Sequence, residues 1–259
     1  MTYSAAMSVV HRVASAVAWG VAGIGLLLLI LLMFLLRPFL DRADPDRRRL
    51  GRMFHGYGVT ILGLQPFVRV HFDVRTTAPY GEPCVVIANH ESDCDVYVSS
   101  WLATLGWNMK YLSKKSLFDL PVFGPAMRMV GDISVIRGDR RSRLDAFERC
   151  RWWLGRGMPV LFFPEGTRSR SGEMAPFKDG AFRLAIEAGA PIRPVVFAGT
   201  RDALPPGEFL FKPARIGIRV LDPIPVAGLT VADSAELAQR VHDLVLAERD
   251  AMRQELERA

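Results

Sequence analysis

A short polar run carries the residues of this chain that are best suited to acid–base chemistry. It occupies residues 89–95, reads Asn-His-Glu-Ser-Asp-Cys-Asp, and directly follows the apolar stretch Cys84–Ala88. A histidine such as His90 can act as a general base near neutral pH when a carboxylate orients its ring and stabilises the imidazolium that forms. The run therefore predicts a proton-transfer site at the end of a strand, where α/β sheets usually carry their sites.

Two aspartates could be the partner of His90. On a regular helix Asp93 would share the face of His90, whereas Asp95 would lie about 140° around the axis. A turn that leads into a helix removes this preference, because His90 can then fold back over Asp95. The spacing alone leaves the choice open.

Three other interpretations of this run compete with a general base. A metal site would need a second His or Cys at matched spacing, which the surrounding sequence lacks. Ser92 could be a nucleophile, but no G-x-S-x-G turn surrounds it. The acids could also cap a helix, with a purely structural role for the histidine.

A second polar run follows another apolar stretch. Residues 162–169 read Phe-Phe-Pro-Glu-Gly-Thr-Arg-Ser. Gly166 permits a sharp turn close to a ligand, and Arg168 presents a planar fork that suits phosphate or carboxylate oxygens. The alternative is a strand-end turn in which Glu165 and Arg168 pair with neighbours. Lys114 and Arg137 add positive charge that could equally be solvated surface.

The elements that must position these runs are short strands alternating with helices. Strict alternation over residues 68–74 predicts a half-buried strand. Further strands are predicted at Cys84–Ala88, Ile133–Ile136, Val160–Phe163, Ile192–Phe197 and Ile216–Val220, and helices at Arg143–Leu154, Ala181–Ala188 and about Ser234 to Arg258. This order predicts an α/β domain with a mixed sheet flanked by helices.

The N-terminal region predicts a membrane anchor. Residues 14–36 contain no charged side chain, and a helix of that span is about 35 Å long, enough to cross a bilayer core. We interpret it as a retained anchor, because the run is longer than a signal-peptide core and no small-residue cleavage pattern follows. More arginines follow the run than precede it, so we expect the rest of the chain on the cytoplasmic face of the cell membrane.

Residues 48–61 have an amphipathic pattern with two interpretations. The segment could lie against anionic head groups, or it could be an ordinary surface helix that covers the domain. We expect residues 1–65 to form the membrane-anchoring and amphipathic segment and residues 66–259 to form the α/β domain.

Composition narrows the class of partner. The chain has 259 residues, half of them apolar, and a formal charge of +6. That charge suits a nucleic acid, an acidic membrane or a phosphorylated substrate. The basic residues form no recognisable nucleic-acid module, so we expect no nucleic-acid partner. The three cysteines form neither an even disulfide framework nor a zinc pattern, which favours a reducing compartment.

Several motifs in fixed order, from about residue 84 to 196, resemble the glycerolipid acyltransferase family, and within it the bacterial 1-acyl-glycerol-3-phosphate acyltransferases. They are Asn89-His90-x-Ser92-x-x-Asp95, Lys114-x-x-Leu117-x-x-x-Pro121-x-x-Gly124, Gly131-x-Ile133-x-x-x-Arg137, Phe163-Pro164-Glu165-Gly166-Thr167-Arg168-Ser169 and Ala190-Pro191-Ile192-x-Pro194-Val195. Outside this core, the resemblance extends only to the general plan of an N-terminal membrane segment.

The resemblance implies a role for each motif. It makes Asp95 the catalytic partner of His90 and gives Asp93 no role. It implies a substrate-binding site in which Arg168 and Lys114 face the substrate phosphate. The full set of substrate-binding residues that it implies is Lys114, Arg137, Glu165, Gly166, Thr167 and Arg168.

The activity implied is transfer of a fatty acyl group from acyl-CoA or acyl carrier protein to the sn-2 hydroxyl of 1-acyl-sn-glycerol-3-phosphate, which gives phosphatidic acid. We expect His90 to deprotonate that hydroxyl directly, with no acyl-enzyme, no metal and no cofactor beyond the donor. Membrane lipids and the two substrates are the expected partners. The alternatives are another lysolipid acceptor, a lipid ester or thioester hydrolase, and a non-catalytic basic membrane protein.

Overall fold

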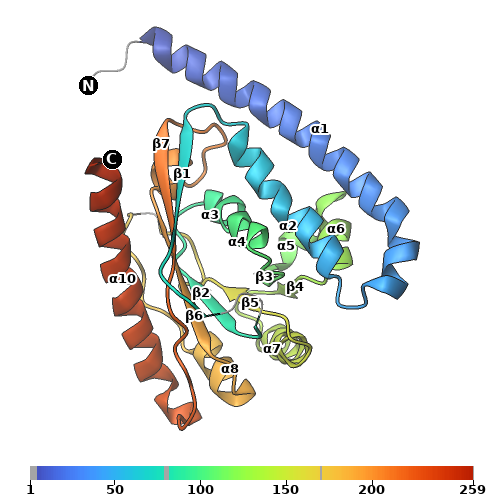
Figure 1. Ribbon diagram of the computed structural model, residues 1–259, viewed down its shortest axis with the longest axis vertical. Coiled ribbons are helices and arrows are strands. Elements are labelled where there is room, and N and C mark those ends of the chain that lie inside the picture. Colours follow the sequence, from blue (N-terminus) through green and yellow to red (C-terminus); the bar gives the residue numbers. More distant parts are fainter. Residues whose placement is uncertain (1–4, 79–81, 170, 259) are drawn as a thin grey trace.

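A seven-stranded mixed sheet forms the centre of the molecule (Figure 1). The computed structural model describes residues 5–78, 82–169 and 171–258. The strands are β1 (Val68–Val74), β2 (Val85–Ala88), β3 (Lys110–Lys114), β4 (Ile133–Val135), β5 (Val160–Phe162), β6 (Ile192–Ala198) and β7 (Ala214–Val220). Their order across the sheet is β1-β7-β6-β2-β5-β3-β4. The α/β fold with a mixed sheet, predicted from the sequence, is confirmed.

Helices pack on both faces of this sheet. They are α1 (Ala5–Ala43), α2 (Arg48–Gly63), α3 (Cys94–Val98), α4 (Ser100–Thr104), α5 (Lys115–Phe118), α6 (Phe123–Val130), α7 (Arg140–Gly155), α8 (Gly180–Ala188), α9 (Thr200–Ala203) and α10 (Ser234–Arg258), with a short 3-10 turn at Val231–Asp233. Val85 and Ile87 of β2 belong to the apolar core beneath α7, α8 and α10, whereas Val86 and Ala88 belong to the core beneath α3 and α4. This alternation follows from the two-residue period of a strand.

The sequence patterns missed one strand. β3 (Lys110–Lys114) joins β5 to β4 by parallel pairing on both sides. Its first residue, Lys110, is fully buried. The Lys110 ammonium donates to the carbonyls of Asp46 at 3.1 Å and Val130 at 2.8 Å. Hydrophobic periodicity counts a lysine as solvent-exposed, so it could not find a strand that begins with a buried one.

The direction of the strands decides where the N-terminal helices join the sheet. β2, β5, β3 and β4 run parallel to one another, and β6 runs parallel to β2. β7 is antiparallel to β6, and β1 is parallel to β7. The start of β1, which follows α2 directly, therefore lies at the same edge of the sheet as the carboxyl ends of β2 and β5.

Helix α2 covers the domain with its apolar face. Leu50, Phe54, Ile61 and Leu62 are buried, and α2 packs against α1, α3, α4 and α6. Gly58 lies so close to Ser100 that an added Cβ would collide with the serine side chain. The structure thus supports the interpretation of residues 48–61 as a helix packed on protein. The expected division at residues 65 and 66 falls in the loop between α2 and β1 and stays a prediction.

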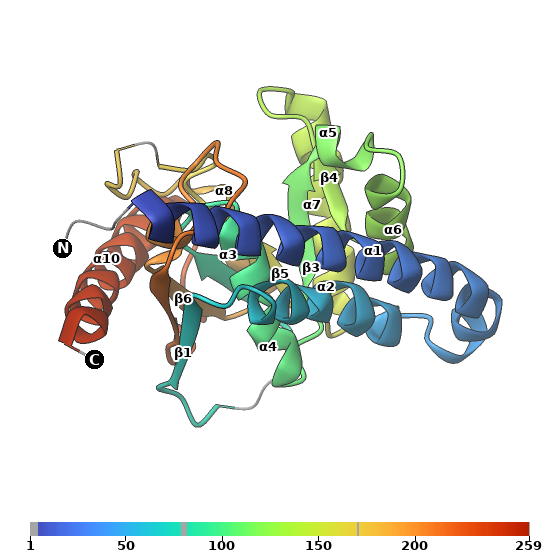
Figure 2. The ribbon, with the colours of Figure 1, turned by 90° about the horizontal axis from the view of Figure 1, so that it is seen from above.

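Helix α1 lies beside α2 and runs across the molecule (Figures 1 and 2). The most apolar stretch of its segment Val9–Ala43 has a mean hydropathy of 2.7, and the segment is long and apolar enough to cross a membrane. One side packs on the domain, where Ala18, Ala22 and Met33 are buried and the Tyr57 hydroxyl donates to the Ala22 carbonyl at 2.9 Å. The other side is exposed and apolar; it includes Val13, Val17, Val21, Ile24, Leu28, Leu31 and Leu35.

Candidate functional site

Four of the five sequence motifs meet at one edge of the sheet. His90 follows β2, the run at 163–169 follows β5, Lys114 ends β3, and Arg137 comes two residues after β4. These four strands are parallel neighbours, so their carboxyl ends share an edge. With strands about 4.8 Å apart, the ends of β2 and β4 are separated by roughly 14 Å.

His90 and Asp95 form a hydrogen-bonded pair. The His90 Nδ1 lies 2.8 Å from the Asp95 Oδ2, and the same oxygen accepts from the backbone N–H groups of Glu91 at 2.7 Å and Ser92 at 2.8 Å. Asp95 is fully buried, whereas the His90 side chain is 13% exposed. With a proton on Nδ1 directed to the carboxylate, Nε2 carries a lone pair and can accept a proton.

The start of helix α3 explains why Asp95 and not Asp93 contacts the histidine. The helix begins only at Cys94, so Asp95 lies in its first turn and His90 lies on the preceding loop. His90 can therefore fold back over Asp95. Asp93 is exposed and forms an ion pair with Arg168. The Ser92 hydroxyl donates to the Leu204 carbonyl at 2.5 Å and accepts from the Cys94 N–H, which is the turn-supporting geometry of a structural serine.

Asn89, the residue before the histidine, is held in place by its side chain. Its side-chain amide donates to the Phe197 carbonyl and accepts from the Phe197 N–H, both at 2.8 Å. This pair of bonds ties the end of β2 to β6. The sequence analysis gave Asn89 no separate role, because its partner lies 108 residues away.

Glu165 joins the two polar runs. One carboxylate oxygen accepts from the His90 N–H at 2.6 Å, and the other accepts from the Ala175 N–H at 3.0 Å. The residue is buried, and this burial raises the pKa of Glu165, while the two backbone N–H groups oppose the rise. Both oxygens are therefore used inside the protein, so a direct substrate contact for Glu165 stays a prediction.

The second polar run, residues 162–169, also contacts the His90 imidazole. The Phe163 ring stacks on the His90 ring with a centroid distance of 4.2 Å. The Ser169 N–H donates to the His90 carbonyl at 3.1 Å. Together with Glu165, these contacts hold His90 from three sides. Phe163 was part of the motif, but no pattern in the sequence indicated the stacking.

Two cationic side chains, Lys178 and Arg168, lie at the turn beside the His90–Asp95 pair. Gly166 has a φ of +74°, and a Cβ there would collide with the Lys178 ammonium, so Lys178 lies directly over the turn. Sequence reasoning missed Lys178. Arg168 comes from the same turn, and its ion pair with Asp93 is 38% and 54% exposed on the two sides, which makes it a weak, replaceable contact. Thr167 is exposed on the turn.

Lys114 and Arg137 complete the basic edge. Both are exposed, and they end or follow the neighbouring strands β3 and β4. The structure places them beyond β5 as seen from His90, on the side of the sheet away from β6. Their role as phosphate ligands stays a prediction.

The C-terminal helix α10 contacts the loop that carries His90. Glu91 is buried, with its carboxylate 3.1 Å from an Arg253 nitrogen and 3.6 Å from an Arg249 nitrogen of α10. Burial raises the pKa of Glu91 to about 7, although the arginines lower it. The sequence predicted α10 only as a helix, and no pattern in it indicated a role for Glu91.

The chain is similar to several known proteins. A family model described as acyltransferase matches residues 68–198. A chloroplastic 1-acyl-sn-glycerol-3-phosphate acyltransferase of Brassica napus is 37% identical over 192 residues, covering 73% of this chain and 54% of that protein. The human 1-acyl-sn-glycerol-3-phosphate acyltransferase alpha is 35% identical over 172 residues, covering 65% of this chain and 59% of that protein.

A solved structure shares the fold. The crystal structure of the 1-acyl-sn-glycerophosphate acyltransferase from Thermotoga maritima matches with a TM-score of 0.65 and 22% identity, covering 89% of this chain and 97% of that chain. The chain spans about half the length of the first chloroplastic relatives it matches. The family match includes both polar runs and the strands that carry them, so the chain belongs to the acyltransferase family.

Proposed function

We propose that this protein transfers an acyl group from a thioester donor to the sn-2 hydroxyl of 1-acyl-sn-glycerol-3-phosphate, giving phosphatidic acid. The observation that carries this proposal is the His90–Asp95 pair, 2.8 Å between Nδ1 and Oδ2, at a sheet edge rich in cations. The relatives named above, all called 1-acyl-sn-glycerol-3-phosphate acyltransferases, support this choice of acceptor.

In this reaction the His90 Nε2 removes the proton from the acceptor hydroxyl. The hydroxyl oxygen attacks the thioester carbonyl, and the tetrahedral intermediate collapses to the new ester and a thiolate, which takes the proton from His90. Asp95 stabilises the imidazolium between these two steps. No covalent acyl-enzyme forms and no cofactor beyond the donor is used, which is consistent with the structural bonds of Ser92.

The acceptor phosphate binds to the cations along the edge. Arg168 is tied to the loop that carries His90, because its ion-pair partner Asp93 lies three residues after His90. A dianionic phosphate can replace the exposed Asp93 carboxylate and make two parallel bonds to the guanidinium. Lys114 and Arg137 reach the phosphate from the side. Fixing the phosphate holds the sn-2 hydroxyl near Nε2, and such orientation can lower the barrier by several kcal/mol, on the order of 7.

The acceptor reaches this edge from a membrane. The exposed apolar side of α1 inserts into the bilayer, while the packing of α1 along the domain keeps the helix against the membrane surface. Trp19 of α1 contacts Tyr97 of α3, with ring centroids 5.8 Å apart, so the anchor lies directly beside the helix that carries Asp95. The arginines that follow α1 are attracted to an anionic leaflet, such as the cytoplasmic face of the cell membrane.

The test is acyl transfer by purified, detergent-solubilised protein to labelled 1-acyl-glycerol-3-phosphate, with acyl-CoA and acyl carrier protein offered separately. Wild-type protein should form phosphatidic acid, and His90→Ala should lose at least 100-fold in rate, within the usual contribution of a general base. The matched control is His71→Ala, an exposed histidine on the edge strand β1, which should keep full activity.

Other outcomes separate the remaining candidates. Acylation of other lysolipids, but not of 1-acyl-glycerol-3-phosphate, would support the acyl-transfer reaction and make another lysolipid the acceptor. Release of free fatty acid with no acylated lipid would indicate a hydrolase. If the protein neither acylates a lysolipid nor releases fatty acid in a His90-dependent way, the proposal is refuted in favour of a non-catalytic membrane protein.

A further inference from the structure

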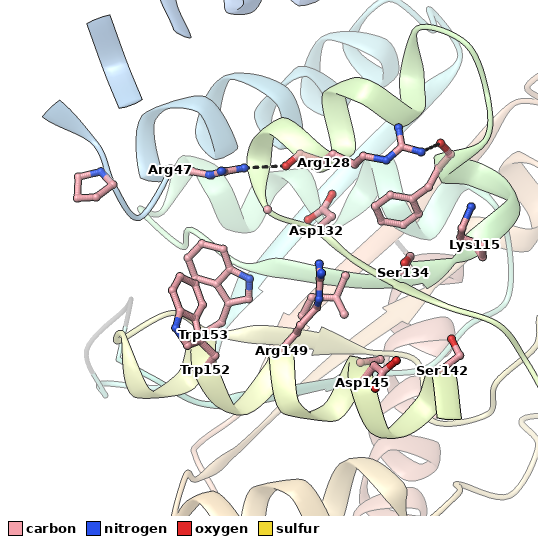
Figure 3. Close-up of a pocket in the computed structure, with 15 residues that line it drawn as sticks. Arg47, Lys115, Arg128, Asp132, Ser134, Ser142, Asp145, Arg149, Trp152 and Trp153 are labelled. Carbon is pink, nitrogen blue, oxygen red and sulfur yellow. Dashed lines mark hydrogen bonds between the residues drawn. The ribbon is translucent and has the colours of Figure 1, made fainter. Parts of the chain in front are cut away.

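A cavity beside the catalytic edge has no role in the reaction described so far. It lies between α6 and α7 along the outer side of strand β4 and has a volume of about 740 Å³, within the range of small-molecule sites (Figure 3). Arg47 and the two tryptophans of α7 lie at one end, and Lys115 and Ser142 lie at the other.

The cavity carries fixed positive charge. The Arg47 guanidinium donates to the carbonyls of Arg128 at 2.7 Å and Met129 at 2.9 Å, and the Arg128 guanidinium donates to the Phe118 carbonyl at 2.5 Å. Carbonyl oxygens hold these groups in place without neutralising them. Arg149 adds a third guanidinium in the middle of the cavity (Figure 3).

The acids of the cavity offset only part of this charge. Asp132 is already paired with His55, at 3.0 Å, and accepts from the Tyr111 N–H. Lys115 forms an ion pair with Asp119 outside the cavity lining. Asp145 is the other acid of the lining, on the same helix as Arg149. The three guanidinium groups therefore outnumber the two carboxylates of the lining, Asp132 and Asp145.

Arg47 is held in a strained backbone conformation. It is the only non-glycine residue in the described chain with a left-handed φ, 58°. Such a conformation costs an L-residue roughly 1–2 kcal/mol and persists where surrounding contacts determine it. The two bonds to α6 carbonyls are such contacts, and they direct the Arg47 side chain into the cavity.

An aromatic surface lies beside the cations. Trp152 is 53% exposed, which is unusual for so large an apolar ring, and Trp153 lies next to it with ring centroids 4.5 Å apart. The guanidinium carbon of Arg156 lies 4.8 Å from the Trp152 ring centroid. An exposed aromatic ring such as that of Trp152, next to arginines, suits a planar base joined to phosphates, because the ring can stack on the base while the arginines bind the oxygens.

The cavity also connects to the catalytic edge. Lys115 lines it and directly follows Lys114, and Ser142 lies in the first turn of α7 at the same end. The end of β4 is separated from the end of β2 by three strand spacings, roughly 14 Å. A ligand with phosphates in the cavity and its reactive group at His90 would need a long, flexible arm between them.

We propose that this cavity binds the adenosine 3′-phosphate 5′-diphosphate end of coenzyme A, so that the pantetheine arm carries the thioester across β3 and β5 to His90. The proposal rests on the proposed function and names its donor. A carrier protein would deliver the same arm without an adenine base, and it would make no use of an aromatic surface.

The test compares two charge reversals on one helix. Arg149→Glu places an acid in the cavity, whereas Arg143→Glu makes the same change on α7 outside the cavity lining. Arg149→Glu should raise the KM for acyl-CoA at least tenfold and leave the KM for 1-acyl-glycerol-3-phosphate within about twofold. Arg143→Glu should change neither. Trp152→Ala should also raise the KM for acyl-CoA, whereas Trp152→Phe should restore it.

A binding measurement separates this proposal from the proposed function. Adenosine 3′,5′-bisphosphate should bind full-length wild-type protein in calorimetry and bind Arg149→Glu at least tenfold more weakly, whether or not the acceptor is acylated. Loss of acyl transfer with this binding intact would refute the proposed function alone. Unchanged binding and unchanged KM for acyl-CoA in Arg149→Glu would overturn the cavity assignment. Activity with acyl carrier protein only, without nucleotide binding, would overturn it in favour of a protein donor.

Discussion

Replacing Glu165 by glutamine tests whether this residue binds substrate or holds the catalytic loop. The two carboxylate oxygens accept from the His90 N–H at 2.6 Å and the Ala175 N–H at 3.0 Å. A glutamine of the same shape has one oxygen and one NH2 group. One of the two backbone donors would then face another donor and remain unpaired.

The size of the effect follows from that unpaired group. A buried donor without a partner costs about 1–3 kcal/mol, and the neutral amide recovers part of the cost of burying a charge. A net loss of about 1–2 kcal/mol should lower the Tm by roughly 2–8 °C for a chain of this size. A shift of the His90 backbone by even part of an ångström should lower kcat by roughly 10- to 100-fold.

The assay combines kinetics with thermal unfolding. All three cysteines are free and buried, so a thiol-reactive fluorophore reports unfolding. We expect Glu165→Gln to lower kcat and Tm and to leave the KM for the acceptor within about twofold. The control is Glu173→Gln, an exposed glutamate of the same loop, which should change neither. A tenfold higher KM for the acceptor with unchanged kcat and Tm would refute this reasoning and make Glu165 a substrate ligand.

Three further predictions concern the polar runs at residues 89–95 and 162–169. Asp95→Asn should lower kcat by roughly 10²- to 10⁴-fold with little change in Tm, because the amide does not hold the His90 tautomer; acyl-transfer rates and thermal scans check this. Burial raises the pKa of Glu91 from 4.5 to about 7, so its contribution to stability is complete below pH 4.5 and lost as the pH rises through 7. The Tm of wild type minus that of Glu91→Gln should therefore fall over this window in thermal scans, and a constant difference would contradict the assignment. Gly166→Ala should cost roughly 1–2 kcal/mol and also impair transfer, because its Cβ would displace the ammonium group over the turn. Gly189→Ala, with a φ of +62° and no atom near the added Cβ, should lower the Tm and leave activity unchanged.

The sequence predicted those strands that show either a regular alternation of apolar and polar residues or a continuous apolar run. β1 has alternating apolar and polar residues, and β6 is buried along its whole length, so periodicity or an apolar run located both. The sequence patterns missed β3 because its first residue, Lys110, is a buried lysine. The aliphatic part of its side chain lies in the core, and its ammonium lies over the Trp153 ring, 4.2 Å from the centroid. Burial lowers the pKa of Lys110 to about 8. Tertiary carbonyl and aromatic partners make this burial possible, and they lie far away in the sequence.

The site was predicted as a set of motifs, but not as a set of contacts. Spacing left Asp93 and Asp95 open, and only the position at which α3 begins brings Asp95 to His90. The inward direction of Glu165 and the place of Lys178 depend on the path of the loop between β5 and α8. Such loops are fixed by bonds to distant backbone groups, which no local pattern encodes.

The reversed direction of β1 has a consequence for how the proposed reaction should be measured. Because β1 starts at the edge of the sheet that carries His90, α1 and α2 join the domain at that same edge. An acceptor dissolved in the bilayer then meets the enzyme by two-dimensional diffusion, and its product returns to the same leaflet. The rate should follow the mole fraction of lysolipid in the surface and fall when an inert detergent or lipid dilutes that surface at constant bulk concentration.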